Sequence, residues 1–114
     1  HNVPIYVGET GENTDKWVED FRVLLDNEKI NWCYWPYKKM NNTKGIMNFK
    51  EPENYHLITE YAKSDRSSYA KMRENRPNIS KVQNALNEYL ELSLYPNNFV
   101  NKGYTKALSF KVKN

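Results

Sequence analysis

The 114-residue sequence contains a single cysteine, Cys33, and only two histidines. One cysteine excludes an internal disulfide, and the apolar neighbours of Cys33 predict a buried free thiol rather than a reactive one. The histidines and the cysteine do not have the spacing of a zinc site. We therefore expect no disulfide and no metal site, while the cysteine content leaves the cellular compartment open.

Long apolar runs are absent as well. No stretch is long enough to cross a bilayer, and the first residues, which begin at His1 without a Met, lack the basic and apolar regions of a signal peptide. These absences predict a soluble chain without a membrane partner, which is either a mature product or a fragment.

No single sign of charge dominates the sequence. It has 17 basic and 14 acidic residues, a net charge of +3, and its lysines are scattered among acids instead of forming a stripe. The basic balance therefore does not indicate a nucleic-acid partner. A chain of this length with 39% hydrophobic residues can form one modest core, so residues 1–114 are expected to be one domain or part of one.

The N-terminal pattern predicts a strand followed by a helix. The run PIYVG over residues 4–8 is bounded by Pro and Gly, which is typical of a strand buried on both faces, and this strand is expected to end at Glu9. Asn13 or Thr14 can cap a helix over about residues 15–27, in which apolar residues recur at helical spacing.

A second strand is expected directly after this helix. The run INWCYW over residues 30–35 is apolar and aromatic, and Pro36 ends it because proline cannot donate to a strand ladder. Strand, helix and strand together predict a parallel βαβ unit. Residues 36–52 are mostly polar, so they predict a long loop, a kind of segment that usually carries function or is disordered.

The remainder of the chain reads mainly as helix. Apolar spacing predicts short helices over residues 53–63 and 67–74. Residues 80–83 have the spacing of a capping box and predict a further helix whose apolar face continues to Ser93. The tail over residues 97–114 alternates apolar and polar residues, which predicts an extended segment that packs onto the body.

Candidate binding residues gather at the expected carboxyl ends of the two strands. Glu9 lies between two glycines, which remove side-chain bulk beside its carboxylate, and Trp35 ends the second strand with Tyr37 and Lys38 after it. In parallel α/β sheets this edge faces the crevice where ligands bind. An aromatic face suits the apolar side of a sugar ring, and neighbouring polar groups can bind its hydroxyls.

The order of these motifs resembles a known family. YVGETG followed by INWCYWPYKK is similar to the seventh and eighth strands of the barrel in glycoside hydrolase family 5, the cellulase family. The downstream stretches MNFKEPENYHLITEYAK, RSSYAKMRENRP and NKGYTKALSF also resemble C-terminal regions of bacterial members, so the resemblance spans nearly the whole chain. It implies an α/β fold in which this chain supplies the C-terminal βα units of a (β/α)8 TIM barrel, about a quarter of the barrel.

The resemblance implies roles for the candidate residues. Glu9 matches the catalytic nucleophile of a retaining enzyme, Trp35 matches the platform beneath the sugar, and Lys38 lies where some members place a polar residue near the substrate. The implied reaction is hydrolysis of a β-linked polysaccharide such as a β-glucan through a covalent glycosyl-enzyme, without a metal or an organic cofactor. Family members that attack polymers are typically exported, which implies an extracellular or cell-envelope location.

The chain also departs from the family pattern. A complete barrel needs roughly 250 residues, and the family's acid/base Glu, which stands in an Asn-Glu-Pro motif after the fourth strand, has no match here. Glu12 is a possible second carboxylate, although its position near a helix N-terminus suits compensation of the helix dipole better. We therefore expect the chain to be inactive alone and to need the N-terminal part of the barrel as another chain.

Two other interpretations remain open. Trp35 and Tyr37 can serve a free-standing carbohydrate-binding module that performs no chemistry. Alternatively, the chain is a small structural α/β domain, in which Glu9 is a turn residue and Trp35 is a core aromatic like Trp32 and Tyr34.

Overall fold

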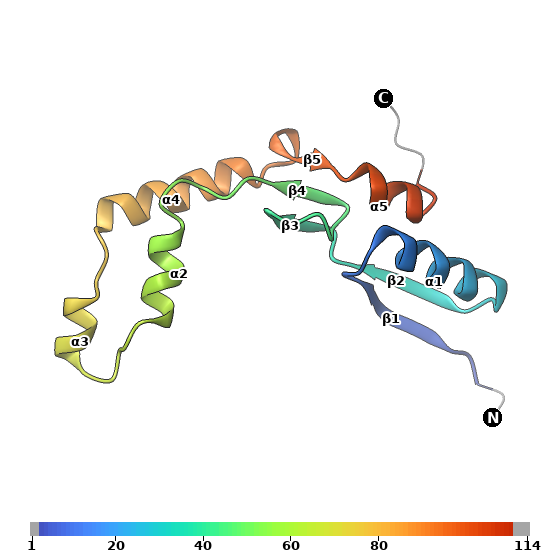
Figure 1. The fold of residues 1–114 in the computed structure, drawn as a ribbon, viewed down its shortest axis with the longest axis horizontal. Coiled ribbons are helices and arrows are strands. Elements are labelled where there is room, and N and C mark those ends of the chain that lie inside the picture. The colour runs from blue at the N-terminus through green and yellow to red at the C-terminus, as the bar shows by residue number, and fades with distance from the viewer. Residues whose placement is uncertain (1–2, 111–114) are drawn as a thin grey trace. The chain divides into compact units, whose positions relative to one another are not determined.

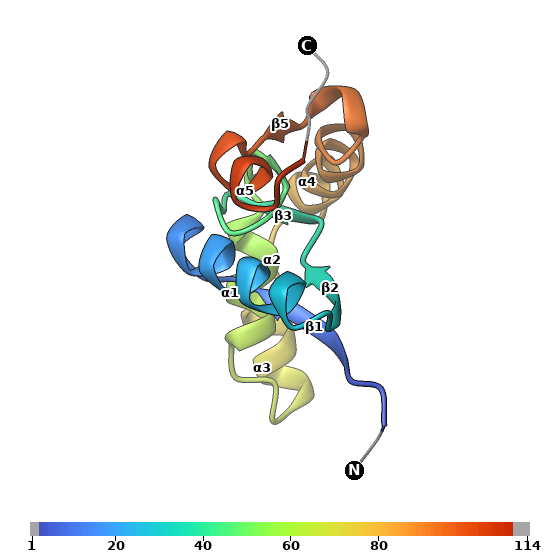
Figure 2. The ribbon, with the colours of Figure 1, turned by 90° about the vertical axis from the view of Figure 1, so that its right-hand side faces the viewer.

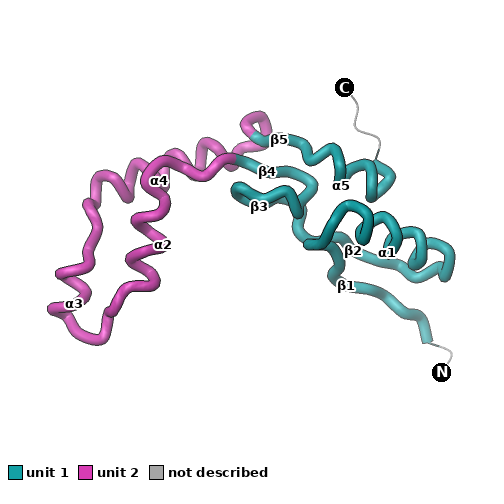
Figure 3. The backbone as a smooth tube through the Cα atoms, viewed as in Figure 1, with its two compact units in different colours: residues 1–49, 98–114 teal, residues 50–97 magenta. Residues whose placement is uncertain are grey.

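The computed structural model describes residues 3–110, and the chain divides into two compact units. Unit 1 comprises residues 1–49 and 98–114, and unit 2 comprises residues 50–97 (Figure 3). The described residues form five α-helices, one 3₁₀-helix and five short strands in two sheets (Figure 1). The fold is therefore mixed α/β, with both sheets in unit 1 and only helices in unit 2.

Unit 1 begins with a βαβ arrangement. Strand β1 (Tyr6–Gly11) pairs in parallel with strand β2 (Asn31–Trp35), and helix α1 (Asp15–Asn27) connects them (Figure 2). The predicted parallel pairing is confirmed. The predicted end of the first strand at Glu9 is wrong, because β1 continues to Gly11, where the backbone still pairs with β2.

Helix α1 begins where its capping residue predicts. The Thr14 hydroxyl oxygen accepts a hydrogen bond from the backbone N–H of Trp17 at 3.3 Å, which satisfies one of the free donors of the first turn. Val18 and Leu25 of the apolar face are buried. The helix therefore covers the sheet through the residues that recur at helical spacing.

Only one face of the β1–β2 sheet is covered. Trp32 and Tyr34 pack against a buried cluster from α1, helix α5 (Lys102–Ala107) and the residue after it, made of Val18, Tyr104, Ala107 and Leu108. On the other face Tyr6 is 62% exposed, and Cys33 is exposed. The predictions of a first strand buried on both faces and of a buried thiol are wrong, because within the described residues no second layer covers this face.

The segment after β2 forms strands where the sequence predicts a loop. Strand β3 (Lys38–Met40) pairs in parallel with strand β4 (Met47–Phe49), and β4 pairs antiparallel with strand β5 (Phe99–Val100). Met47 and Phe49 are buried. The loop prediction for residues 36–52 is therefore wrong in part, since strands of three residues are too short to show a period of two in the sequence.

The C-terminal segment contradicts the extended tail predicted for residues 97–114. After β5 the chain forms α5, in which Tyr104 is almost completely buried, and burial raises the pKa of its hydroxyl. Gly103 lowers the helix propensity of this stretch, so the local sequence does not indicate a helix. Burial of the Tyr104 ring outweighs that cost. Residues 111–114 of the predicted tail lie outside the described residues.

Unit 2 consists of helices α2 (His56–Lys63), α3 (Tyr69–Glu74) and α4 (Ile79–Leu92), followed by the 3₁₀-helix η1 (Tyr95–Asn97). The predicted helices exist, although α2 begins three residues later than predicted, at His56 rather than at residue 53. Among residues 3–110, no helix has both the length and the apolar character that crossing a bilayer requires.

Helix α4 begins earlier than the sequence predicts. Asn78 is its N-cap, and the Asn78 side chain accepts a hydrogen bond from the backbone N–H of Lys81 at 3.0 Å. The predicted capping box at residues 80–83 is therefore wrong, because asparagine is an equally good cap and stands two residues earlier. The rings of Tyr55 and Tyr89 stack with centroids 5.7 Å apart and join α4 to the start of α2.

Candidate functional site

The carboxyl edge of the β1–β2 sheet carries the residues that the sequence singles out. Trp35 ends β2, and its register partner across the sheet is Gly11, the last residue of β1. Glu9 lies two residues before Gly11, within the irregular stretch of pairing between Val7 and Thr10. The parallel pairing thus brings Trp35, at the end of β2, to the strand that carries Glu9 two residues before its own end, although the two residues are 26 positions apart in the sequence.

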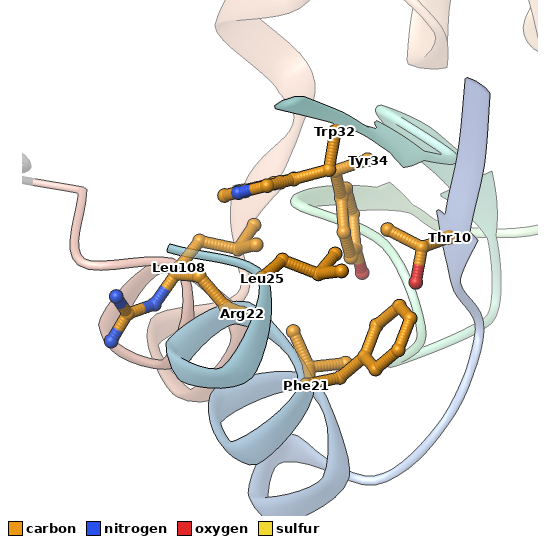
Figure 4. Close-up of a pocket in the computed structure, with 8 residues that line it drawn as sticks. Thr10, Phe21, Arg22, Leu25, Trp32, Tyr34 and Leu108 are labelled. Atoms are coloured by element: carbon orange, nitrogen blue, oxygen red, sulfur yellow. The ribbon is translucent and has the colours of Figure 1, made fainter. Parts of the chain in front are cut away.

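The two strands direct these side chains away from α1. Thr10, Trp32 and Tyr34 line a small cavity between the sheet and α1 (Figure 4). The indole N–H of Trp32 donates to the carboxylate of Asp26 on α1 at 3.0 Å, and this bond lowers the pKa of Asp26. Successive side chains of a strand point to opposite faces. Glu9 precedes Thr10 and Trp35 follows Tyr34, so we infer that Glu9 and Trp35 project from the face of the sheet that α1 does not cover.

The covered side of the sheet is not a ligand site. The cavity between α1 and the sheet has a volume of only about 10 Å³, which is the space of a single water molecule. A sugar ring cannot enter it. The opposite side of the β1–β2 sheet is therefore the candidate site. We call this side, which bears Glu9, Trp35 and the exposed Tyr6 and Cys33, the open face.

The open face is polar as well as aromatic. The side chains of Tyr6 and Cys33 are hydrogen-bonded to each other, and this bond raises the pKa of the Tyr6 hydroxyl. Trp35 is 56% exposed and Tyr37, on the segment that follows β2, is 53% exposed. These exposed aromatic rings leave apolar area accessible to a ligand. Trp35 is thus not a core aromatic in this chain.

Lys38 is placed differently from the other predicted site residues. It begins β3, and its ammonium group lies 5.8 Å from the centre of the Phe49 ring, which is a cation–π distance. The structure therefore joins Glu9 and Trp35 at one sheet edge, with Tyr37 on the connecting segment, whereas Lys38 contacts the second sheet.

Glu12 has a partner that the sequence analysis missed. Its carboxylate forms an ion pair with the ammonium group of Lys39, and its backbone has a φ of 53° directly after Gly11. The ion pair links the segment after β1 to β3. Because the two residues are 27 positions apart, no local pattern indicates the contact. This pairing favours a structural role for Glu12 over a catalytic one.

The structure also shows whether side chains that bind metals gather in one place. In the part of the chain that the structure describes, no three side chains among His, Cys, Asp and Glu gather at a spacing that would hold a metal ion. The open face presents the carboxylate of Glu9, and the rings of Tyr6 and Trp35 are exposed on it. A carboxylate of this kind can act as a nucleophile or accept hydrogen bonds from sugar hydroxyls.

Comparison of the chain with protein-family models, with curated proteins and with solved structures gives no match.

Proposed function

We propose that this chain is the C-terminal part of a (β/α)8 barrel that belongs to a retaining β-glycoside hydrolase of the cellulase family. Glu9 is the nucleophile, Trp35 is the platform under the reacting sugar, and Tyr37 and Lys38 bind further parts of the substrate. The substrate is a β-linked polysaccharide such as a β-glucan, and the enzyme acts outside the cell or in the cell envelope.

One observation carries the proposal. Trp35 ends β2, and Glu9 lies two residues before the end of the adjacent parallel strand β1; both side chains are exposed, while the face of the sheet that carries Trp32 and Tyr34 is covered by α1 and α5. In a (β/α)8 barrel the helices cover the outside of the sheet, and the substrate binds at the carboxyl ends of the strands. A strand pair with one helix-covered and one open face is the arrangement expected of two barrel strands without their neighbours.

In this proposal the reaction has two steps. The Glu9 carboxylate attacks the anomeric carbon and forms a covalent glycosyl-enzyme, while an acid protonates the leaving oxygen. Water then attacks the same carbon, the same acid residue acts as the base, and the product keeps its configuration. Trp35 supports the sugar ring in the distorted geometry that precedes attack.

The second carboxylate comes from outside this chain. Retaining enzymes hold their two carboxyl groups about 5–5.5 Å apart. Glu12 is ion-paired with Lys39 and begins the segment that leads into α1, so it does not supply the acid. The complete enzyme is therefore this chain assembled with the N-terminal part of the barrel, which is another chain, and we expect this chain alone to be inactive.

A second function is favoured by a specific observation. Trp35 and Tyr37 are both more than half exposed on neighbouring positions, which is also the arrangement of a binding surface for sugars. If the chain is a carbohydrate-binding module, the isolated chain should bind glycans, and there should be no rate of glycan hydrolysis that depends on Glu9. The two functions are separated by experiments on Trp35 and Glu9.

The Trp35→Ala substitution distinguishes these functions. In the complete enzyme we expect the rate of glycan hydrolysis to fall by about 10²-fold together with a loss of glycan affinity, because the ring positions the reacting sugar. Since Trp35 is 56% exposed in this chain, its unfolding free energy should change by less than the roughly 3–5 kcal/mol that truncation of a buried Trp costs. Hydrolysis rate, glycan affinity and melting temperature are measured on the same variant.

Trp17→Ala is the matched control for this prediction. Trp17 is 39% exposed on α1 and stacks on Phe21 at 4.9 Å, outside the open face. Its truncation should leave the rate of hydrolysis unchanged. If Trp35→Ala lowers affinity but the wild-type enzyme hydrolyses no glycan, the binding module is the correct function. A large stability loss without an effect on sugar would instead support a structural role.

A further inference from the structure

Strand β1 carries one residue more than β2 over the same stretch of their pairing. The register pairs that flank this stretch are Val7 with Trp32 and Thr10 with Tyr34. Gly8 and Glu9 of β1 therefore lie opposite a single residue of β2, Cys33. Two residues against one is the count that defines a β-bulge, and this bulge contains the candidate nucleophile.

The exposure of the residues agrees with this count. Along β2, exposed and partly buried residues alternate over the whole strand. In β1, Gly8 and Glu9 are exposed in succession between the partly buried Val7 and Thr10. Since a regular strand changes face at every residue, two exposed residues in succession mark the place where the extra residue is accommodated. Gly8 and Glu9 therefore both lie on the side of the exposed Cys33.

The side chain of Tyr6 lies beside the bulge. A Cβ at Gly8 would be 3.6 Å from the Tyr6 ring, so the ring stands against the glycine on the open face. The Tyr6 and Cys33 side chains are hydrogen-bonded to each other, which ties the ring to the opposite strand. These contacts place a ring against the bulge residue that has no side chain, and they leave Glu9 exposed.

Pairing of the two strands does not require the extra residue. Without Gly8, the six-residue β1 would match the five residues of β2 one to one, and every register pair of the two strands would be kept. A glycine inside a strand also weakens it, and bulges are rare between parallel strands. The hydrogen bonding of the sheet therefore does not explain the bulge.

A bulge changes where its side chains point. The extra residue bends the strand and increases its local twist, and bulges beside active sites re-aim a side chain. In β1 the side chain concerned is a carboxylate, Glu9, on the strand that pairs with the one that Trp35 ends. A misplacement of about 1 Å near a reacting group can lower a rate by about 10²-fold.

We propose that Gly8 is a positioning residue: as the extra residue of the bulge, it displaces Glu9 from the strand ladder and aims its carboxylate at the anomeric carbon of a sugar on the open face. This role rests on the proposed function, in which Glu9 is the nucleophile. Gly8 itself acts only through the backbone of the bulge. The Tyr6 ring, tied to Cys33, supports the bulge from the open face.

The test removes the bulge and keeps the carboxylate. Deletion of Gly8 leaves Glu9 as the single residue opposite Cys33, still on the open face, with the register pairs on both sides retained. In the complete enzyme we expect kcat to fall by at least about 10²-fold, because the carboxylate is no longer displaced from the ladder. KM should change by less than about 3-fold, since the Trp35 platform is unchanged. The melting temperature should shift by less than about 4 °C.

Gly8→Ala is the matched control, because it changes the same residue and keeps the bulge. Its Cβ makes only ordinary contact with the Tyr6 ring, so kcat should stay within about 3-fold of the wild type. A lower kcat with an unchanged KM and melting temperature indicates a misplaced group. A merely structural role for Gly8 would instead lower the melting temperature of the deletion variant and leave the kcat of its folded fraction unchanged.

If deletion of Gly8 prevents folding, an exchange of the two bulge residues decides. Gly8→Glu with Glu9→Gly keeps the number of residues and the composition, but moves the carboxylate by one position, toward the Tyr6 ring. We expect a loss in kcat of at least about 10²-fold at an unchanged melting temperature. Near-normal kcat in the deletion variant or in the exchange variant overturns the proposal. An equal loss of kcat in Gly8→Ala also overturns it, because the glycine rather than the bulge would then be required.

These outcomes are separate from a failure of the proposed function. The proposed hydrolase fails if Glu9→Gln keeps near-normal turnover or if the complete enzyme hydrolyses no glycan, and the positioning role of Gly8 then fails with it. If turnover depends on Glu9 while deletion of Gly8 leaves kcat near normal, only the positioning role fails.

Discussion

Replacement of Glu9 by Gln should reduce glycan hydrolysis by the complete enzyme by at least about 10³-fold, because an amide oxygen does not attack an anomeric carbon as a carboxylate does. The fold should be retained, since Glu9 is exposed on the open face and Gln has the same shape. Initial rates on a β-glucan, with the melting temperature measured on the same preparation, check both expectations.

Glu12→Gln is the matched control for this prediction. It makes the same carboxylate-to-amide change three residues further along the chain, at a side chain that is ion-paired with Lys39. An exposed or half-exposed ion pair contributes only about 0–1 kcal/mol, so turnover should stay close to that of the wild type. If Glu9→Gln kept near-normal turnover in a preparation free of wild-type enzyme, Glu9 would not be the nucleophile. If Glu12→Gln lost turnover instead, Glu12 would be the catalytic carboxylate.

Replacement of Gly11 by Ala should destabilise the chain by about 3–5 kcal/mol. Gly11 has a φ of 131°, which residues with a side chain rarely adopt. A Cβ at this position would also overlap the backbone carbonyl oxygen of Trp35 and would lie 2.7 Å from the ring of Tyr34. Since small domains are stable by only about 5–15 kcal/mol, the loss should be visible as a large decrease in the urea midpoint.

Gly8→Ala is the control on the same strand. A Cβ at Gly8 would meet only the Tyr6 ring, at 3.6 and 3.9 Å, which is ordinary van der Waals contact. We expect no loss of stability, or a gain of about 0.4–1 kcal/mol from the lower entropy of the unfolded chain. Equal urea midpoints for Gly11→Ala and Gly8→Ala would contradict the strained backbone at Gly11. The two glycines of the Gly8–Gly11 stretch thus have different roles, because only the backbone at Gly11 requires a glycine.

The local features of unit 1 were accessible from the sequence for a physical reason. The Thr14 cap and the apolar face of α1 depend on residues that are close together in the chain, and the parallel pairing of the two apolar runs follows from the order strand, helix, strand. The pairing then places Glu9 and Trp35 at one sheet edge, so their proximity was also predictable once both runs were taken as parallel strands. Their roles as nucleophile and platform stay predictions.

Other elements were not predictable because their sequence patterns are too short or fit two alternatives equally well. Strands β3 and β4 have three residues each, which is too short for an alternating pattern. Helix α5 contains Gly103 and is stabilised by the burial of Tyr104. Asn78 and Ser80 are both good caps, and only the hydrogen bond from the Lys81 N–H selects Asn78.

The sequence by itself determined the βαβ arrangement, the presence of the helices of unit 2 and the position of Trp35 at a strand end, because periodicity and chain-breaking residues act over a few positions. Only the tertiary structure decided which face of the β1–β2 sheet is covered, that Cys33 and Trp35 are exposed, and that Glu12 pairs with Lys39. These features depend on contacts between segments distant in the chain. Burial and ion pairing are properties of the assembled layers, and no local pattern of residues contains them.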